Sequence, residues 1–270
     1  AEAWLNGASP YSVYGFWNPV WGVLPFLPLT LLPITVAQWV WVVATLLGAM
    51  LALARFKVPP LRVAAFVLLS PFCLLNFHFA NVDWLVLLGA TLPPQVGIWL
   101  VALKPQTGFV VIIGWTLRIW RKDGWRGVAK LLLPISSVVV IQLVTIGFGM
   151  PDAKATASNF SLLPWGIPFG VLMLIKYVRE GETADGLIAA FCLTPYLSLP
   201  SWLTAVPWAG QSTKRTVFAI VAAWGALLFW QISTGLYANT IIGWLSLIAA
   251  GWLGWKMLRP AAPTHHPIGG

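Results

Sequence analysis

Two charged residues that lie among apolar segments are the first candidates for chemistry in this sequence. Asp83 begins a short apolar run two residues after Asn81, and Lys104 ends the next run, just before Pro105 and Gln106. A carboxylate can accept hydrogen bonds from a polar substrate or act as a base, and a lysine ammonium binds phosphate as a point charge. A purely structural Asp83–Lys104 ion pair, or a lysine that extends to lipid headgroups, explains the same spacing equally well.

The composition indicates what kind of scaffold must hold these residues. Hydrophobic residues make up 59% of the 270 residues and charged residues only 9%, and the mean hydropathy is +0.83. Soluble domains carry about 25% charged residues because their surface must be hydrated. We therefore exclude a soluble fold and expect an all-α, polytopic transmembrane helix bundle, with many of the 18 Trp residues at the membrane–water interfaces.

The net charge of +9 indicates membrane orientation rather than a nucleic-acid partner, because the basic residues form short clusters between apolar runs. The clusters are Arg55, Lys57 and Arg62; Arg118, Arg121, Lys122, Arg126 and Lys130; Lys176 and Arg179; Lys214 and Arg215; Lys256 and Arg259. Cytoplasmic loops carry such an excess of Lys and Arg. Placing all five clusters inside leaves Lys104 and Lys154 as the exceptions, and it puts the N-terminus outside and the C-terminus inside.

Seven apolar segments are long enough, or nearly so, to span a membrane: residues 35–54, 63–79, 105–120, 131–149, 161–178, 216–235 and 240–257. Two further stretches, 82–103 and 187–210, each hold two short runs, so up to 11 segments are expected. Helices of ten residues extend only ~15 Å, short of a hydrocarbon core about 30 Å thick. These pairs favour re-entrant helices around a cavity, with kinked ordinary spans as the alternative.

Three regions follow from these patterns. Residues 1–34 are rich in proline and aromatic residues, Tyr11 among them, and we expect an outer interfacial loop because proline at that density prevents a regular spanning helix. Residues 35–257 are the expected transmembrane bundle, and residues 258–270 the expected disordered cytoplasmic tail. The two cysteines have no neighbours with metal-ligand spacing, so no metal or cofactor is expected.

Four short stretches, taken in their order and spacing, resemble a known family. Ala3–Tyr11 is similar to a segment with Gly and Pro-Tyr in the family's first outer loop, and Asn18–Pro33 is similar to its proline-rich run. Ala80–Asp83 lies where the family has Gly-Gln-x-Asn, and Leu103–Gln106 resembles its Lys-Pro motif. The family is glycosyltransferase family 87, the polyprenol-phosphate-mannose-dependent α-mannosyltransferases of bacterial membranes, in the C-type glycosyltransferase superfold.

The resemblance implies an inverting transfer of a sugar, mannose in this family, from a polyprenyl-phosphate-linked donor. The reaction would take place on the outer face of the bacterial cytoplasmic (inner) membrane, in a multi-pass protein. Substrate binding would fall to Tyr11, Asn81, Asp83, Lys104 and Gln106. The family's catalytic acid is expected upstream of Ala1, the first residue of this sequence, after a first membrane helix, so the catalytic residue is unknown.

Two other functions stay open at this point. Ala80 and Asn81 stand where the family has Gly-Gln, and together with the missing acid this departure allows a non-catalytic accessory subunit of a larger membrane complex. The two broken helix pairs also suggest a lipid-linked sugar transporter. We rank the transporter last, because the second broken pair offers hydroxyl groups and no charge.

Overall fold

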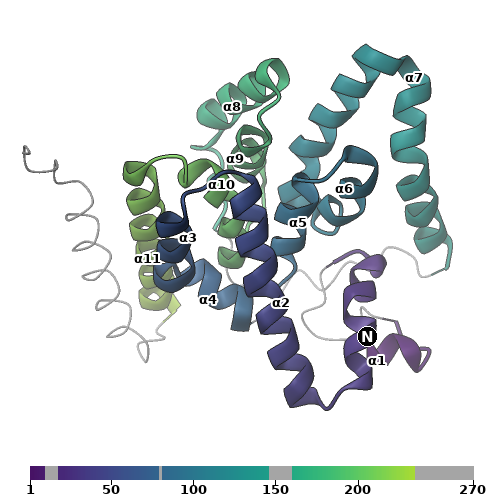
Figure 1. Cartoon of the computed structure of the whole chain (residues 1–270), viewed down its shortest axis with the longest axis horizontal. Coiled ribbons are helices and arrows are strands. Elements are labelled where there is room, and N and C mark those ends of the chain that lie inside the picture. Colours follow the sequence, from purple (N-terminus) through teal and green to yellow (C-terminus); the bar gives the residue numbers. More distant parts are fainter. Residues whose placement is uncertain (10–17, 79–80, 146–159, 235–270) are drawn as a thin grey trace, which may run out of the picture.

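The computed structural model describes residues 1–9, 18–78, 81–145 and 160–234, and within these ranges all regular structure is helical, without a strand (Figure 1). The α-helices are α1 (Glu2–Leu5), α2 (Ile34–Arg55), α3 (Pro60–Leu69), α4 (Pro71–His78), α5 (Asp83–Ala90), α6 (Pro94–Val101), α7 (Pro105–Thr145), α8 (Ile167–Glu180), α9 (Thr183–Leu193), α10 (Val206–Ala209) and α11 (Thr213–Thr234). Two 3-10 helices, η2 (Val20–Leu31) and η4 (Leu199–Ala205), complete these ranges. The expectation of an all-α fold is thus confirmed for the described residues.

Two of these helices are long and apolar enough to cross a membrane. Helix α2 has 22 residues, which gives a length of ~33 Å. Helix α7 has two arms that meet at Gly124, where φ is 64° and ψ is −159°, a conformation that glycine adopts readily. The expected spans 105–120 and 131–149 correspond to these arms, seen at the right of Figure 1, although residues 146–149 lie outside the described residues.

Other expected spans are shorter or interrupted in the structure. Segment 63–79 is divided into α3 and α4 at Ser70, which is extended (φ −93°, ψ 134°), because Pro71 has no N–H and disfavours a helical residue before it. Segment 161–178 contains only the 14-residue helix α8. Segment 216–235 corresponds to α11, whereas segment 240–257 and the tail 258–270 lie outside the described residues.

The region 1–34, expected as a loop, is partly helical where the structure describes it. Residues 20–31 form η2 with Pro25 and Pro28 inside it, and its first residues, Val20 to Val23, are buried. Proline fixes φ near its helical value, so Pro25 and Pro28 are compatible with this 12-residue 3-10 helix. The first four residues of η2 therefore belong to the protein core.

The two broken pairs do contain short helices. Helices α5 and α6 have eight residues each, and Pro93 precedes α6. The pair packs closely, since a Cβ on Gly97 would clash with the carbonyl oxygen of Gly89. In the second pair, α9 ends at Leu193 and the chain becomes extended at Thr194 before η4 and α10.

Helix α5 lies near the centre of the packed elements. All its residues except Leu88 are buried, and it contacts α2, α6 and η4. The Trp84 ring packs directly over Gly48 of α2 and leaves no room there for a Cβ. Because Asp83 is the first residue of this enclosed helix, its carboxylate is buried with it.

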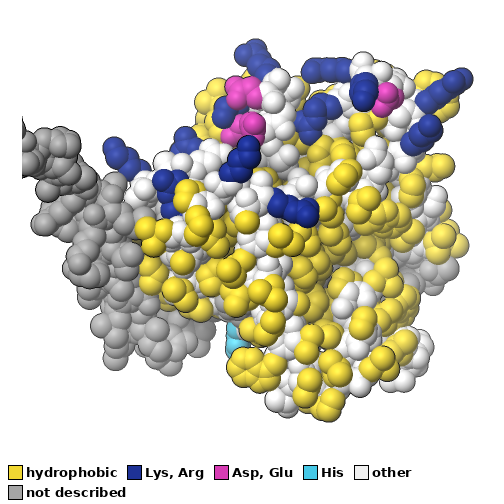
Figure 2. Space-filling model, in the orientation of Figure 1, with side chains coloured by type: hydrophobic (Ala, Val, Ile, Leu, Met, Phe, Trp, Pro, Cys, Tyr) yellow, Lys and Arg dark blue, Asp and Glu magenta, His cyan; other side chains and the backbone are white. Residues whose placement is uncertain are grey.

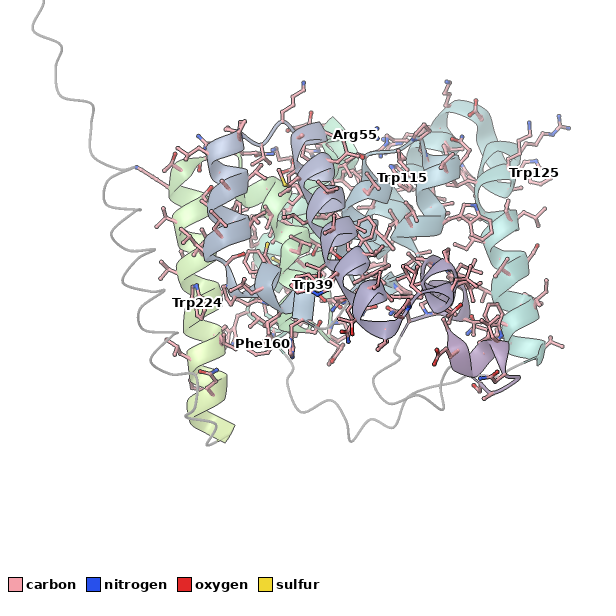
Figure 3. The ribbon with its side chains drawn as sticks, turned by 60° about the horizontal axis from the view of Figure 1, so that its bottom comes forward. Trp39, Arg55, Trp115, Trp125, Phe160 and Trp224 are labelled. Carbon is pink, nitrogen blue, oxygen red and sulfur yellow. The ribbon has the colours of Figure 1, made fainter. Side chains whose placement is uncertain are left out.

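Most of the charged side chains on the face shown in Figure 2 lie at one end of the molecule. On the face shown in Figure 2, Lys, Arg, Asp and Glu lie mainly along the upper edge, and hydrophobic side chains cover the body below. Figure 3 places Arg55 and Trp125 toward this end, and Phe160 toward the other. The Arg62 guanidinium donates to the Gly210 carbonyl oxygen over 2.9 Å, which ties two of the basic turns together.

Candidate functional site

Asp83 and Lys104, the two candidates from the sequence, form a buried ion pair. The Lys104 Nζ atom lies 2.7 Å from Asp83 Oδ2, and the side chains are 7% and 0% exposed, respectively. Asp83 begins α5, and Lys104 lies in the turn between α6 and α7. The α5–α6 hairpin therefore brings these residues together.

Asn81 completes a three-residue cluster. Its Oδ1 atom accepts a hydrogen bond from Lys104 Nζ over 3.0 Å and one from the Val82 backbone N–H over 2.8 Å. A lysine ammonium has three donors, and Asp83 and Asn81 occupy two. Among the described residues the third N–H has no acceptor, and Asp83 Oδ1 is buried with no hydrogen-bond partner. The cluster thus keeps one donor and one acceptor for a further group.

The cluster lies beside the middle of α2. Trp84, next to Asp83, packs over Gly48 and makes an edge contact with Trp41, with ring centroids 5.7 Å apart. Residues 41–48 are the middle of α2, so the cluster is level with the middle of that helix. Charge counting along the sequence locates the loops but not the depth at which a short helix begins.

Further buried polar atoms that have no partner within the described ranges lie where α2 packs against α5. They are Trp41 Nε1, Thr45 Oγ1 and Trp84 Nε1. Positions 41, 45 and 48 share one face of α2, and this face contacts Trp84. Buried polar groups in native proteins are nearly always hydrogen-bonded to protein, water or ligand, so this region is suited to water or a polar ligand.

Asn76 connects the cluster to the second broken pair, a role that the sequence analysis missed. Its Nδ2 atom donates to the carbonyl oxygens of Phe72, over 2.8 Å, and Pro200, over 2.6 Å. The backbone carbonyl oxygen of Asn76 accepts a hydrogen bond from the Asn81 backbone N–H over 3.1 Å. Asn76 therefore fixes the turn that carries Asn81 against η4. An asparagine in an apolar run was the available signal.

The other predicted binding residues are not part of the observed cluster. Gln106 is half-buried in the first turn of α7, and within the described ranges it makes no hydrogen bond to Asn81, Asp83 or Lys104. Tyr11 lies outside the described residues. Their assignment as substrate-binding residues remains a prediction.

The catalytic acid was expected upstream of Ala1, outside this sequence. Ala1 is the residue that precedes the short helix α1. Glu2 is exposed in the first turn of that helix, and it makes no ion pair with Lys104 among the described residues. The catalytic residue therefore stays unknown, and an acid upstream of Ala1 stays a prediction.

A second buried carboxylate lies in the first turn of α9. Asp185 is 1% exposed, its Oδ2 atom lies 2.8 Å from Lys176 Nζ, and its Oδ1 atom has no hydrogen-bond partner in the described part of the chain. Nearby, the Tyr177 hydroxyl accepts from Arg118 Nη2 over 2.9 Å and donates to the Val111 carbonyl oxygen over 3.1 Å. These contacts join α7, α8 and α9. Their burial depends on tertiary packing that the charge pattern does not contain.

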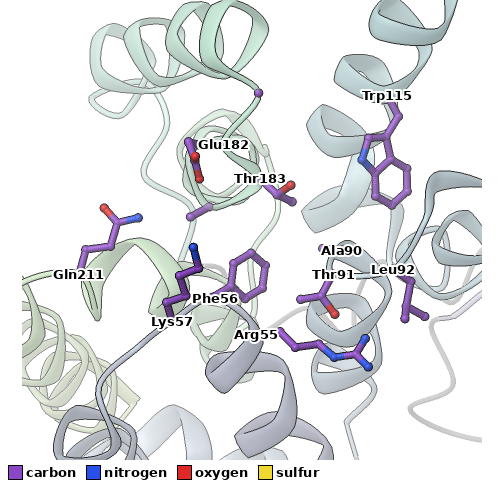
Figure 4. A pocket seen from close by; sticks show the side chains of 12 residues that line it. Arg55, Phe56, Lys57, Ala90, Thr91, Leu92, Trp115, Glu182, Thr183 and Gln211 are labelled. Atoms are coloured by element: carbon purple, nitrogen blue, oxygen red, sulfur yellow. The ribbon is translucent and has the colours of Figure 1, made fainter.

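A pocket of about 550 Å³ opens at the basic end of the molecule (Figure 4). Its polar lining comes from four turns and includes Arg55, Lys57, Thr91, Glu182 and Gln211. Ala90 also lines it, so the pocket lies at the opposite end of α5 from Asp83. The pocket and the Asn81–Asp83–Lys104 cluster are therefore two separate places, one helix length apart.

Comparisons with protein-family models, curated proteins and solved structures find no match to this chain. The described residues contain no group of three or more His, Cys, Asp or Glu side chains that could hold a metal ion. The chemistry of the site is accordingly argued from the geometry above, and the family resemblance stays a hypothesis.

Proposed function

We propose that this chain is a multi-pass glycosyltransferase of the bacterial cytoplasmic membrane. It would bind a polyprenyl-phosphate-linked sugar, mannose by the resemblance, at Asn81, Asp83 and Lys104. The observation that carries the proposal is the buried ion pair with one open donor and one open acceptor among the described residues. Ionised groups inside an apolar bundle are expensive and mark functional sites by default.

The distribution of charge supports the membrane part of the proposal. Helices α2 and α7 meet the length and hydropathy needed to cross a bilayer, and large apolar side chains are exposed along them, including Trp39 at 67% and Val144 at 81%. Such surfaces are stable in lipid and not in water. The gathering of basic side chains at one end (Figure 2) agrees with the expected orientation of the seven-span bundle.

The cluster has the polar groups that this reaction needs around the sugar-donor substrate. In the proposed transfer, the acceptor oxygen forms a bond to the anomeric carbon while the bond from that carbon to the phosphate oxygen breaks. The electron pair goes to the phosphate and the acceptor's proton to a carboxylate base. Lys104 would stabilise the departing phosphate through its open N–H, and Asp83 Oδ1 would accept from a sugar hydroxyl. The resemblance places the base upstream of Ala1, outside this sequence.

The second candidate is a non-catalytic subunit of a membrane complex. The same ion pair also favours this candidate, because Asp83 Oδ2 lies 2.7 Å from Lys104 Nζ and balances its charge. A pair of this kind holds the α5–α6 hairpin to the start of α7 without any ligand. The two candidates differ in what removal of the lysine does to transfer of the sugar.

The test is transfer of radiolabelled mannose from polyprenyl-phosphate-mannose by the full-length protein in membrane vesicles. Lys104→Met should reduce the transfer rate by at least about a hundredfold, the effect of losing one preorganised donor. Lys214→Met is the matched control, since Lys214 is an exposed lysine of the basic end, and it should keep the parent rate. Parent-rate transfer by inserted, folded Lys104→Met protein would show that the cluster does not act on the substrate.

A further inference from the structure

We infer that the pocket at the basic end binds a phosphate ester that carries hydroxyl groups, as an anionic glycerophospholipid headgroup does. This inference rests on the membrane orientation in the proposed function but concerns a different site, at the opposite end of α5 from the sugar-donor cluster. The pocket volume of about 550 Å³ lies in the range of small-ligand sites and exceeds what a bare phosphate ion would fill.

Two cations at the end of α2 face this pocket, and neither has a counterion among the described residues. Arg55 and Lys57 both line it, and neither side chain has a hydrogen bond or an ion pair within the described part of the chain. Figure 4 shows Arg55 beside Thr91 and Leu92, and Lys57 on the side of Glu182 and Gln211. The Phe56 side chain lies between the two cations in this view, so the pocket has one cation on each side of it.

The backbone at Lys57 adopts a left-handed conformation at the end of α2. Its φ is +58°, and its N–H bonds to the Ala54 carbonyl oxygen at the end of α2, in a C-terminal position that glycine usually occupies. A side chain in this conformation is disfavoured. Strained residues concentrate at functional sites, and here the conformation carries the lysine side chain into the pocket lining.

The beginning of α9 adds neutral donors. Thr183 and Ala184 are its first residues and line the pocket, and the side chain of Glu182 makes no capping hydrogen bond to them. The first backbone N–H groups of a helix have no intrahelical acceptor, and phosphate groups bind at such ends. Arg118 Nη1 is also buried without a partner in the described ranges. It lies beside Gly181, which lines the pocket, since a Cβ on Gly181 would be 3.8 Å from it.

The rest of the lining explains why we expect hydroxyl groups beside the phosphate. Glu182, Gln211 and Thr91 all line the pocket, and an ionised Glu182 can only accept hydrogen bonds. The Gln211 amide nitrogen can donate, since its oxygen accepts from Arg215, and the Thr91 hydroxyl, which donates to the Leu88 carbonyl oxygen, can accept. Glu182 would repel a second phosphate but would bind a glycerol or sugar hydroxyl. One phosphate with a polyol substituent satisfies both the cations and the carboxylate.

The experiment measures the thermal unfolding midpoint of the detergent-purified full chain against ligand concentration, because a ligand that binds the folded state raises this midpoint. The probes are short-chain phosphatidylglycerol, glycerol 3-phosphate and glycerol. We expect both phosphate esters, but not glycerol, to raise the midpoint. A stronger effect of the lipid identifies a membrane headgroup as the source, and an equal effect identifies a soluble phosphate ester.

Variants decide whether the pocket is the binding site. Arg55→Gln and Lys57→Gln should each weaken the affinity for phosphatidylglycerol at least about tenfold, the effect of one charge-assisted hydrogen bond. Lys214→Gln, which changes a basic residue outside the pocket lining, should stay within about twofold. Lys57→Gly should lose affinity like Lys57→Gln while raising the midpoint without ligand, since glycine relieves the backbone strain.

Two results would overturn the inference. One is an equal loss of affinity in Lys214→Gln and in the pocket variants, which would indicate only a diffuse surface charge. The other is no response of the parent protein to either phosphate ester. Mannose transfer is measured on the same preparations, so loss of phosphate binding with transfer intact contradicts this inference alone, and the reverse result contradicts the proposed function alone.

Discussion

The Asp83–Lys104 pair should behave as one thermodynamic unit. At the observed separation of 2.7 Å, the Coulomb attraction is about 6 kcal/mol for an effective dielectric constant of about 20. Both charges lose their hydration on burial, and this loss offsets much of the attraction. Removing one partner leaves the other charge buried alone, which costs about 3–5 kcal/mol of unfolding free energy.

The perturbation is therefore a double-mutant cycle with Asp83→Leu, Lys104→Met and the two together. We expect each single variant to lose about 3–5 kcal/mol, with Asp83→Leu at the lower end because Asn81 still accepts from Lys104. The double variant should return to within about 1 kcal/mol of the parent, because apolar residues of similar volume replace a buried pair with little loss. These values imply a coupling energy of at least about 5 kcal/mol.

Equilibrium unfolding in mixed micelles, followed by the fluorescence of the 18 Trp residues, measures these differences. Glu180→Gln is the control, since the exposed Lys176–Glu180 pair has a separation of 3.7 Å and should contribute below about 0.5 kcal/mol. If the unfolding free energies lost by Asp83→Leu and Lys104→Met add up to the loss in the double variant within about 0.5 kcal/mol, the two side chains do not form an ion pair.

Two other predictions concern the packing around the site. Gly97→Ala should lower the unfolding free energy by about 1–3 kcal/mol, because the new methyl group clashes with the Gly89 carbonyl oxygen. A Cβ on Gly225 of helix α11 meets nothing within 4 Å, so Gly225→Ala should raise the unfolding free energy by about 0.5–1 kcal/mol. Thermal unfolding of both variants measures this contrast, and equal shifts of the midpoint would contradict it. Asp185→Ala should lower the unfolding free energy by about 1–3 kcal/mol through loss of the Lys176 contact, measured in the same micelles, and an unchanged value would mean that the carboxylate is hydrated.

The existence of the ion pair was predictable from sequence, whereas its depth was not. Asp83 and Lys104 flank a hairpin of two short apolar runs, so each had few other partners in an apolar background. Hydropathy gives the length of a helix but not its tilt or the level at which it begins. The contact of Trp84 with Gly48 sets that level, and it depends on how α5 packs against α2.

Some helix boundaries were also predictable from sequence, whereas the burial of Asp185 was not. Pro71 and Pro93 carry local signals, and the chain breaks before each of them as proline sterics require. The burial of Asp185 carries no such signal, since it lies among Glu180, Gly181 and Glu182 in a stretch that is typical of a solvated loop. The packing of α9 against α8 and α7 encloses its carboxylate.

The most direct test of the account is mannose transfer by the Asp83→Leu/Lys104→Met double variant in the full-length protein. This variant should unfold within about 1 kcal/mol of the parent, so a loss of transfer cannot be assigned to misfolding. We predict transfer from polyprenyl-phosphate-mannose reduced by at least about a hundredfold, because the open donor of Lys104 and the open acceptor of Asp83 are both gone. Transfer at the parent rate would contradict the proposal and leave the pair with a structural role alone.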